Sequence, residues 1–243
     1  MITLIGTGHV FDLTQPLLRI FDEKQPDVLC LELDKNRYQA MMMRKTDPEG
    51  YKEASKDQPI VYKLLARFQN NMAKEYGVEA GQEMITAADY AQSHHTPLAF
   101  IDMNAQNLFS RMLKEMTIRE KIKMALSGFS GIFISKKKVE KELDKIQGEF
   151  DSYIKQVGKN FPTVKRILID ERNAYMIQQL RVANEQYERV IAVVGDGHIP
   201  GLAEMLKEKN IDFETIRLKE LRERRFETSD SSSASFSIEH KEP

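Results

Sequence analysis

Short apolar runs rich in β-branched residues recur along the chain, and longer stretches of mixed polarity separate them. Runs of this kind are typical of strands that are buried on both faces of a sheet. They predict strands over residues 2–5, 27–33, 98–101, 190–194 and 213–218. Because such strands alternate with helical stretches, the pattern favours an α/β fold with a mainly parallel β-sheet flanked by helices.

The stretches between these strands carry apolar residues at helical spacing. Leu17, Leu18 and Phe21 predict a helix over 14–24, which completes a strand–helix–strand unit with the first two strands. A turn is expected at 47–50, and a helix is expected from 56 to a break near Gly77. Further helices are expected over residues 35–44, 80–93, 104–126, 136–156, 162–185 and 200–209. The segment from about 104 to 160 is then a helical insertion between strands.

Chain length and composition indicate one domain followed by a tail. Residues 1–226 are expected to form a single domain, because a chain of 243 residues can bury a sizeable core. Residues 227–243 form a Ser-rich tail without periodicity, for which we expect disorder. Residues 127–135 contain four large apolar side chains, and such a tip would fold into the core, dock a partner or support a homodimer.

Charge and cysteine content narrow the expected environment. The net charge is −1, so the basic surface typical of nucleic-acid binding is missing and no nucleic-acid partner is expected. The single cysteine, Cys30, lies inside an apolar run, where burial suppresses thiol reactivity. A chain that cannot form an internal disulfide fits a reducing cytosol. No stretch reaches the roughly 18 to 20 apolar residues that span a bilayer. We therefore expect a cytoplasmic protein, with membrane attachment only in a longer form.

A repeated motif follows the first and the fourth predicted strands. Gly6-Thr7-Gly8-His9 follows the first, and Gly195-Asp196-Gly197-His198 follows the fourth. Glycine allows the sharp turn that leaves the next side chain pointing into a crevice. A dinucleotide-binding loop is a poor interpretation, because neither copy has the third glycine of that motif. The repeat instead predicts two histidines at a common site.

Polar side chains follow each of the buried strands. They are His9, then Glu32 and Asp34, then Asp102, and finally Asp196 and His198. Because the carboxyl ends of parallel strands form the ligand-binding edge of a sheet, we expect these groups to converge. Two imidazoles and several carboxylates can hold a divalent transition metal that activates water. The alternative is that single members only cap helices or fill structural positions.

A further acidic residue falls within the long helix predicted from Pro162. Val164, Leu168, Glu171 and Tyr175 lie on one stripe of a regular helix. If that stripe faces the core, Glu171 needs a partner, either Arg172 or a group of the metal site. The alternative is that Glu171 points into solvent at the end of the stripe.

Several motifs, in order along residues 1–218, resemble the TraB/PrgY family. That family is related to the Tiki proteases and, more distantly, to erythromycin esterase and ChaN-like proteins. The motifs are Gly6-Thr7-Gly8-His9-Val10, Glu32-Leu33-Asp34 with Arg37, Gly77 to Met84, Ile101-Asp102 with Arg111, Asp170 to Met176, and Val193 to Gly201. Met103 departs from the family pattern, in which an arginine is expected after the Ile-Asp pair.

The resemblance implies a Tiki/EreA/ChaN-like fold and a metal-dependent hydrolase. It points to His9, His198 and Glu32 as metal ligands and to a set of polar or catalytic groups around them. These groups are Glu32, Glu83, Asp102, Arg111, Glu171 and Arg172. The metal would be Mn²⁺, Co²⁺ or Zn²⁺, and Arg111 or Arg172 would stabilise an oxyanion or bind a peptide carboxylate.

Two functions follow from these expectations. The leading hypothesis is a metal-dependent peptidase that acts on short peptides, as in the shutdown of a peptide pheromone, and that functions as a homodimer. The alternative is a non-catalytic protein that sequesters a peptide and carries a structural metal. Peptide cleavage in the presence of added metal would separate the two.

Overall fold

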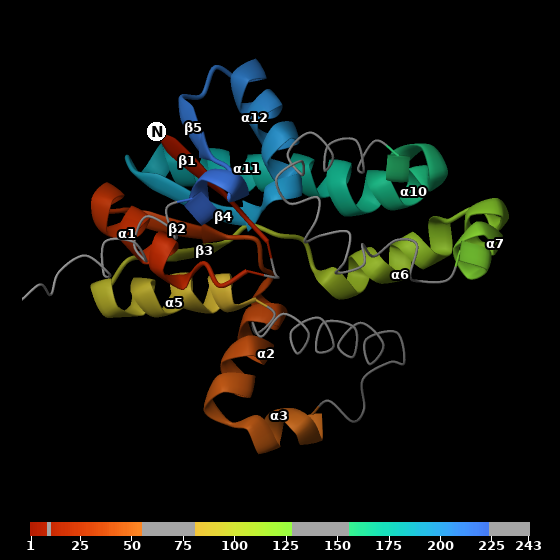
Figure 1. The fold of residues 1–243 in the computed structure, drawn as a ribbon, viewed down its shortest axis with the longest axis horizontal. Helices are drawn as coiled ribbons and strands as arrows, with labels where there is room; N and C mark the ends of the chain where they lie inside the picture. The colour runs from red at the N-terminus through yellow and green to blue at the C-terminus, as the bar shows by residue number, and fades with distance from the viewer. Residues whose placement is uncertain (9–10, 55–80, 128–155, 224–243) are drawn as a thin grey trace, which may run out of the picture.

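A parallel five-stranded sheet forms the centre of the protein. The computed structural model describes residues 1–8, 11–54, 81–127 and 156–223. The strands are β1 (Ile2–Thr7), β2 (Val28–Leu31), β3 (Leu98–Phe100), β4 (Val190–Gly195) and β5 (Phe213–Ile216). Their order is β3-β2-β4-β1-β5, and every paired neighbour is parallel (Figure 1). The predicted α/β class with a parallel sheet is therefore confirmed.

Helices surround this sheet and also extend beyond it. They are α1 (Thr14–Lys24), α2 (Lys35–Thr46), α3 (Pro48–Ala54), α5 (Gln82–His94), α6 (Ala105–Glu115), α7 (Ile118–Ser127), α10 (Pro162–Lys165), α11 (Glu171–Gln186) and α12 (Ile199–Glu208). A π-helical segment, η2 (Arg166–Asp170), joins α10 to α11, and a 3-10 turn, η3 (Asp196–His198), joins β4 to α12.

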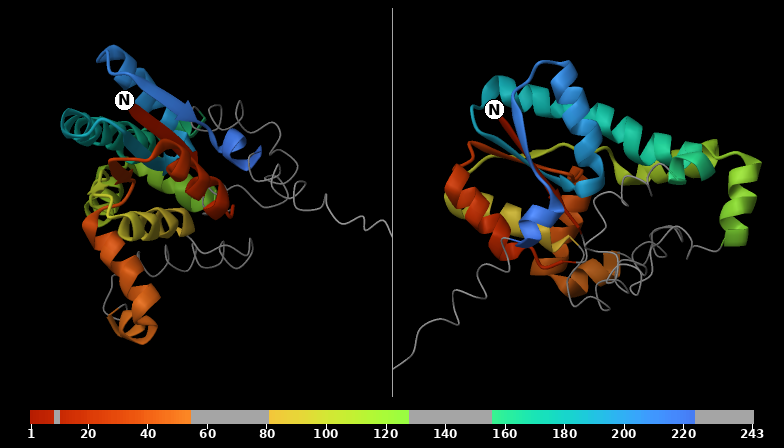
Figure 2. Two further views of the ribbon diagram at one scale, coloured as in Figure 1. Left: turned by 90° about the vertical axis from the view of Figure 1, so that its left-hand side faces the viewer. Right: turned by 45° about the horizontal axis from the view of Figure 1, so that its top comes forward.

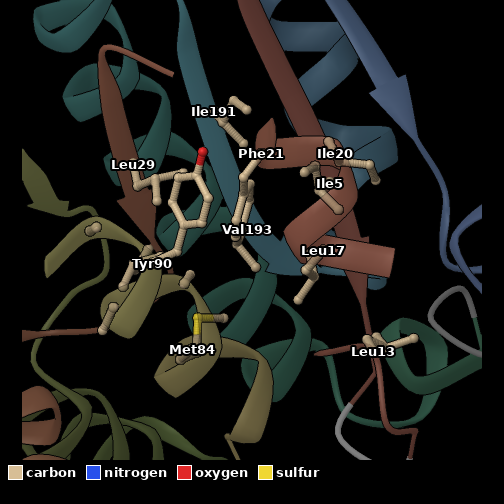
Figure 3. Packing of buried hydrophobic residues seen from close by; sticks show 14 of the residues in the cluster. Ile5, Leu13, Leu17, Ile20, Phe21, Leu29, Met84, Tyr90, Ile191 and Val193 are labelled. Atoms are coloured by element: carbon tan, nitrogen blue, oxygen red, sulfur yellow. The ribbon is translucent and has the colours of Figure 1, made fainter. Parts of the chain in front are cut away.

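Both faces of the sheet are covered, which explains why its strands are continuous apolar runs. On one face, α1 and α5 pack against alternate strand residues; Figure 3 shows Phe21 and Tyr90 beside Leu29, Ile191 and Val193. On the other face, Leu180 of α11 and Leu202 of α12 belong to the cluster that contains the intervening strand residues. Cys30 is fully buried in this second cluster, as predicted, and burial raises its pKa to about 12.

A third, smaller apolar cluster lies outside the sheet. It consists of Leu108, Met112, Met116, Phe161, Val164 and Ile167, which come from α6, α10, η2 and the segments beside them. The arm that these elements form, residues 105–127 and 161–170, projects away from the sheet in Figure 1 and in the right-hand view of Figure 2. Among the described residues, no helix is both long enough and apolar enough to cross a membrane.

Several predicted boundaries are wrong, and local chemistry explains them. The expected turn at 47–50 is the start of α3, where Asp47 Oδ1 accepts a hydrogen bond from the Gly50 amide at 2.9 Å and Pro48 takes the first helical position. The expected helix over 104–126 is divided into α6 and α7. Thr117 and Glu120 form a capping box there, with Thr117 N donating to Glu120 Oε2 at 2.9 Å and Glu120 N to Thr117 Oγ1 at 3.2 Å.

The long helix from Pro162 to Gln186 is present, but its middle is π-helical. A π-helical turn contains more residues than an α-helical turn, so it rotates the following residues relative to a regular helix. The helices or tips predicted over 56–76, 128–135 and 136–155, and the tail over 227–243, lie outside the described residues.

Candidate functional site

The carboxyl edge of the sheet gathers several of the polar residues predicted from the sequence. Glu32 follows β2, Asp102 lies two residues after β3, and Asp196 and His198 form the 3-10 turn after β4. Because β2 lies between β3 and β4, the side chains at these three strand ends can meet. Asp102, Asp196 and His198 are buried.

Arg172, at the start of α11, joins two of these carboxylates. Its Nε donates to Asp102 Oδ1 at 2.9 Å and its Nη2 to Asp102 Oδ2 at 2.8 Å, which is a bidentate pair. The same Nη2 also donates to Glu32 Oε1. Burial alone would lower the pKa of Arg172, but Glu32 and Asp102 raise it above its usual range. Arg172 therefore stays charged and is the counterion of both acids.

Glu32 connects this arginine to the histidine turn. Its Oε2 accepts a hydrogen bond from the Gly195 amide at 2.6 Å, at the last residue of β4. Its Oε1 lies 3.4 Å from His198 Nε2. Glu32, Asp102, Arg172 and His198 therefore form one contiguous group, which we call the edge cluster. The sequence predicted all four of its members.

Asn173 orients the imidazole of His198. The Asn173 amide oxygen Oδ1 lies 2.6 Å from His198 Nδ1, and both side chains are buried. Because an amide oxygen only accepts, Nδ1 carries the proton and Nε2 presents its lone pair toward Glu32. Burial lowers the pKa of His198 below 6.5, and Arg172 lowers it further, against the opposite effect of Glu32 and Asp102. The neutral tautomer is thus favoured, with two acceptor atoms facing each other.

Arg37, in the first turn of α2, supplies a second guanidinium beside Asp102. Its Nη1 lies 3.5 Å from Asp102 Oδ2, and its side chain is 36% exposed whereas that of Asp102 is 1% exposed. This is the part of the site where Met103 stands in place of the expected arginine. Arg37 and Arg172 thus provide positive charge at Asp102 from other elements.

A second ion pair holds the neighbouring end of the same edge. Arg217, one residue after β5, makes a bidentate pair with Asp196, with Nε to Oδ1 at 2.9 Å and Nη2 to Oδ2 at 2.7 Å. Strand β1 lies between β4 and β5, so the Asp196 side chain crosses the end of β1. Gly6 leaves room for this crossing, because a Cβ there would lie 2.2 Å from Asp196 Oδ1.

Other predicted residues occupy different places. Glu171 is partly exposed and pairs with Arg111 at 2.9 Å and with Arg166 at 2.5 Å. The prediction that Arg172 is its partner is therefore wrong. Arg111 and Arg166 also pair with Glu115, at 3.3 and 2.6 Å, which closes an exposed ring of four charges. The π-helical turn explains this, because it rotates Glu171 away from the stripe expected for a regular helix.

Glu83 and Asp34 lie near the carboxyl edge on neighbouring helices. Glu83 is buried in the first turn of α5, and since α5 leads back to the start of β3, that first turn is level with the carboxyl edge. Asp34 caps α2 by accepting from the amides of Asn36 and Arg37, at 2.9 and 3.1 Å. Its predicted alternative role as a helix cap is therefore the observed one.

The first histidine of the repeat, His9, lies outside the described residues. Its strand, β1, pairs with β4 so that Thr7 is level with Gly195, and the two copies of the motif are therefore offset by one residue. Within the part of the chain that the structure describes, no group of three or more His, Cys, Asp or Glu residues is arranged to hold a metal ion. The two described atoms at this edge that face each other and could both bind a metal ion are His198 Nε2 and Glu32 Oε1.

Comparison with known proteins fits this arrangement. The model of the TraB/PrgY/gumN family matches residues 1–215, which include strands β1 to β4, most of β5 and the edge cluster. The chain belongs to the TraB/PrgY/gumN family. An uncharacterised protein of Methanocaldococcus jannaschii is 26% identical over 231 residues, covering 92% of this chain and 58% of the relative.

Mammalian proteins of the TraB family are also similar. TraB domain-containing proteins of Bos taurus and Homo sapiens are 24% and 22% identical, each covering 82% of this chain, and 60% and 61% of their own length. The chain thus spans about three fifths of the length of these curated relatives.

The sequence analysis did not identify three residues that hold the polar groups at the carboxyl edge of the sheet. Asn173 and Arg37 lie inside the motifs that carry the family resemblance, but spacing alone gives neither of them a partner. Arg217 belongs to none of those motifs. Only the strand order could have indicated that Arg217 reaches Asp196, because it places the end of β5 two strands away from the end of β4.

Proposed function

We propose that this TraB-family protein is a metal-dependent hydrolase that cleaves short peptides and thereby inactivates a peptide signal. The observation that carries the proposal is the approach of His198 Nε2 to Glu32 Oε1 at 3.4 Å, with a lone pair on each atom. Two acceptors that face each other repel unless a proton or a cation lies between them. Since the pKa of His198 is lowered, a cation is the better match.

The donor types fit a divalent transition metal. Neutral imidazole nitrogen and carboxylate oxygen are ligands of Zn²⁺, Mn²⁺ and Co²⁺. Asn173 holds Nδ1 of His198 as a hydrogen-bond partner typically holds a metal-ligating histidine. In this proposal His9 is the third ligand, because its motif follows β1, which is paired with β4. A divalent ion bound by these residues would supply Lewis-acid activation of water for attack on an amide carbonyl.

The neighbouring residues have separate tasks. Arg172 and the Gly195 amide fix the two oxygens of Glu32, so this carboxylate keeps one orientation. Asp102 accepts from Arg172 and from the Met103 amide, which suits it to hold Arg172 rather than to take a proton. Glu83 was predicted among the polar or catalytic groups; because it is buried at the level of the same edge and Glu32 serves as a ligand, this proposal gives it the role of general base.

Arg37 is the guanidinium that this proposal assigns to the substrate. Arg172 and Arg111 are each engaged by two carboxylates, whereas among the described residues the only ion pair of Arg37 is the long one with Asp102. A partly exposed arginine can bind a carboxylate in bidentate fashion. The role of binding a peptide carboxylate therefore passes from Arg111 or Arg172 to Arg37.

The proposal is tested by metal content and peptide cleavage on the full chain. The protein is stripped with a chelator, reloaded separately with Mn²⁺, Co²⁺ or Zn²⁺, and incubated with a defined mixture of short peptides that is read by mass spectrometry. We expect cleavage with at least one metal. We also expect His198→Ala and Glu32→Gln to lower both bound metal and cleavage by about 100-fold, because each removes a ligand.

His95→Asn serves as the matched control for the loss of an imidazole. His95 is exposed at the end of α5 with φ of 55°, a conformation that asparagine also adopts. This variant should retain metal and activity. If His198→Ala and Glu32→Gln both retain them as well, the edge cluster is not the metal site and the proposal is wrong.

Sequestration of a peptide without cleavage is the second candidate. Its support is that Arg172 and Arg37 together offset the charges of Glu32 and Asp102, which reduces the negative charge available to a cation. Such a protein would bind a peptide through Arg37 and would carry at most a structural metal. Titration of the same peptides distinguishes the two functions, since saturable binding without turnover under every metal would favour sequestration.

A further inference from the structure

The outer face of α7 carries apolar side chains that the described residues leave uncovered. Ile118 is 76% exposed and Ile122 is 55% exposed. The two residues are four apart in one helix, so they lie on the same face, one above the other. In Figure 1 and in the right-hand view of Figure 2, α7 lies at the end of the arm that is remote from the sheet. This face is therefore accessible to a large partner.

The orientation of α7 is fixed by its inner face. Glu120 is buried and Met124 packs against the apolar cluster of the arm. At 100° per residue, the direction opposite these two residues is occupied by Ile122, with Ile118 next to it. Arg119 and Lys121 fall on the two sides of this apolar ridge. Ile118 and Ile122 thus form the outermost line of the helix, with a cation on each side.

The charge of this face has one sign. Arg119 and Lys121 are exposed, whereas Glu120, the acidic residue of α7, is directed inward. Its Oε1 and Oε2 accept hydrogen bonds from Thr163 N and Thr163 Oγ1, both at 2.9 Å. No exposed carboxylate within α7 compensates the cations. The face therefore combines an apolar ridge with a positive potential.

We propose that α7 binds the surface of a membrane that contains anionic lipids. A helix with an apolar ridge between basic side chains lies in the plane of the interface, with its apolar side chains at the acyl boundary and its cations among the headgroups. Contact between the α7 helices of two copies would place Arg119 and Lys121 against like charges, which opposes dimerisation through this face. The anionic surface is the occupant that matches both the apolar ridge and the charge.

Vesicle sedimentation with the full chain tests this proposal independently of any hydrolase activity. One set of vesicles is phosphatidylcholine alone, and the other contains about a third phosphatidylglycerol. We expect binding to the anionic vesicles that weakens with added salt, and little binding to the neutral ones. The double variant Ile118→Ser/Ile122→Ser and the double variant Arg119→Glu/Lys121→Glu should each weaken binding by about tenfold or more.

Two matched controls separate this face from general effects. Val182→Ser changes another exposed apolar residue, 46% exposed on α11, and Lys207→Glu/Lys209→Glu makes the same change in net charge at the end of α12. Both should bind the anionic vesicles as the unchanged protein does. The proposal would be overturned if the unchanged protein does not bind the anionic vesicles. It would also be overturned if both α7 variants bind them as tightly as the unchanged protein does.

Two further measurements identify the competing occupants of this face. If the protein dimerises in sedimentation equilibrium and Ile118→Ser/Ile122→Ser abolishes the dimer without changing vesicle binding, the occupant is a second copy and the lipid proposal is wrong. If the same variant instead lowers the midpoint of thermal unfolding and binds vesicles normally, the protein itself covers this ridge, which also overturns the proposal. An unchanged midpoint with lost vesicle binding supports it.

Discussion

At the scale of single residues, Arg172 is the most constrained side chain of the edge cluster. It is largely buried, it contacts two carboxylates, and its Nη1 also donates to the Leu168 carbonyl at 3.2 Å inside the π-helical segment. A charge removed from water costs several kcal/mol unless it is paired, so the three groups depend on one another. Removing the arginine would leave Glu32 and Asp102 buried without their main counterion.

We therefore predict that Arg172→Met lowers the free energy of unfolding by about 3–5 kcal/mol, as measured by urea denaturation. Arg111→Met is the control, because it also removes an arginine with two carboxylate partners, in a ring that is largely exposed. Its loss should be much smaller, since exposed ion pairs are screened by solvent. Equal losses of unfolding free energy in the two variants would show that burial does not determine how much Arg172 contributes to stability.

Asn173 supports the imidazole rather than any reacting group. Asn173→Ala should leave the fold intact but free the His198 ring, and we expect metal affinity to fall by about 10- to 100-fold. Equilibrium dialysis of the stripped protein against Zn²⁺ measures this directly. Asn184→Ala is the control, because the buried Asn184 Oδ1 has no hydrogen-bond partner in the described structure. If both variants bind metal normally, His198 is not held for a metal.

At the scale of the elements, the strands were predictable, and so was the position of the polar residues that follow them. Residues of β1, β2 and β4 are buried on both faces, so their sequences are continuous apolar runs that need no alignment to identify. Parallel pairing then brings Glu32, Asp102 and His198 to one edge. The sequence named Arg172 as a site residue, but the contacts that Arg172 and Asn173 make with this edge were not predictable, because the π-helical turn before them changes the rotation of α11 and leaves no clear sequence signal.

The division between α6 and α7 did have a sequence signal, which is the capping box from Thr117 to Glu120. Burial alone would raise the pKa of Glu120, but hydrogen bonds from Thr117 and Thr163 outweigh it and hold the pKa below 4.5. The stabilisation is therefore fully present above pH 4.5 and is lost as the pH falls through the lower pKa of the folded state. This carboxylate fixes both the start of α7 and the position of α10.

We predict that Glu120→Gln lowers the free energy of unfolding by about 1–2 kcal/mol at neutral pH, because an amide NH₂ group would face the Thr117 and Thr163 donors. The difference from the unchanged protein should shrink as the pH falls below 4.5. Urea denaturation at a series of pH values measures both effects. Glu204→Gln, at an exposed position of α12, should change neither, and a constant difference at every pH would contradict the assigned role of Glu120.

At the scale of the whole molecule, the described residues include a sheet body and an arm with its own apolar cluster. The body buries both faces of the sheet beneath α1, α5, α11 and α12, whereas the arm cluster contains far fewer buried residues. Helical periodicity predicted that residues 104–160 form an insertion, but it could not show that α6 packs against Phe161, Val164 and Ile167 in a cluster of its own. Regions with less buried apolar surface open at lower free energy.

Amide hydrogen exchange read by mass spectrometry should therefore distinguish the two parts. We expect β1 and β4 to exchange most slowly, because both are inner strands, and α6, α7 and α10 to exchange by local opening of the arm. Met112→Ala removes a buried side chain from the arm cluster and should speed exchange in α6, α7 and residues 162–170, while β1 and β4 remain protected. Leu180→Ala removes a fully buried side chain from the body cluster and should speed exchange in the strands as well. If Met112→Ala instead speeds exchange in β1 and β4 as much as in the arm, the two clusters unfold as one unit, and the arm cannot move independently of the sheet.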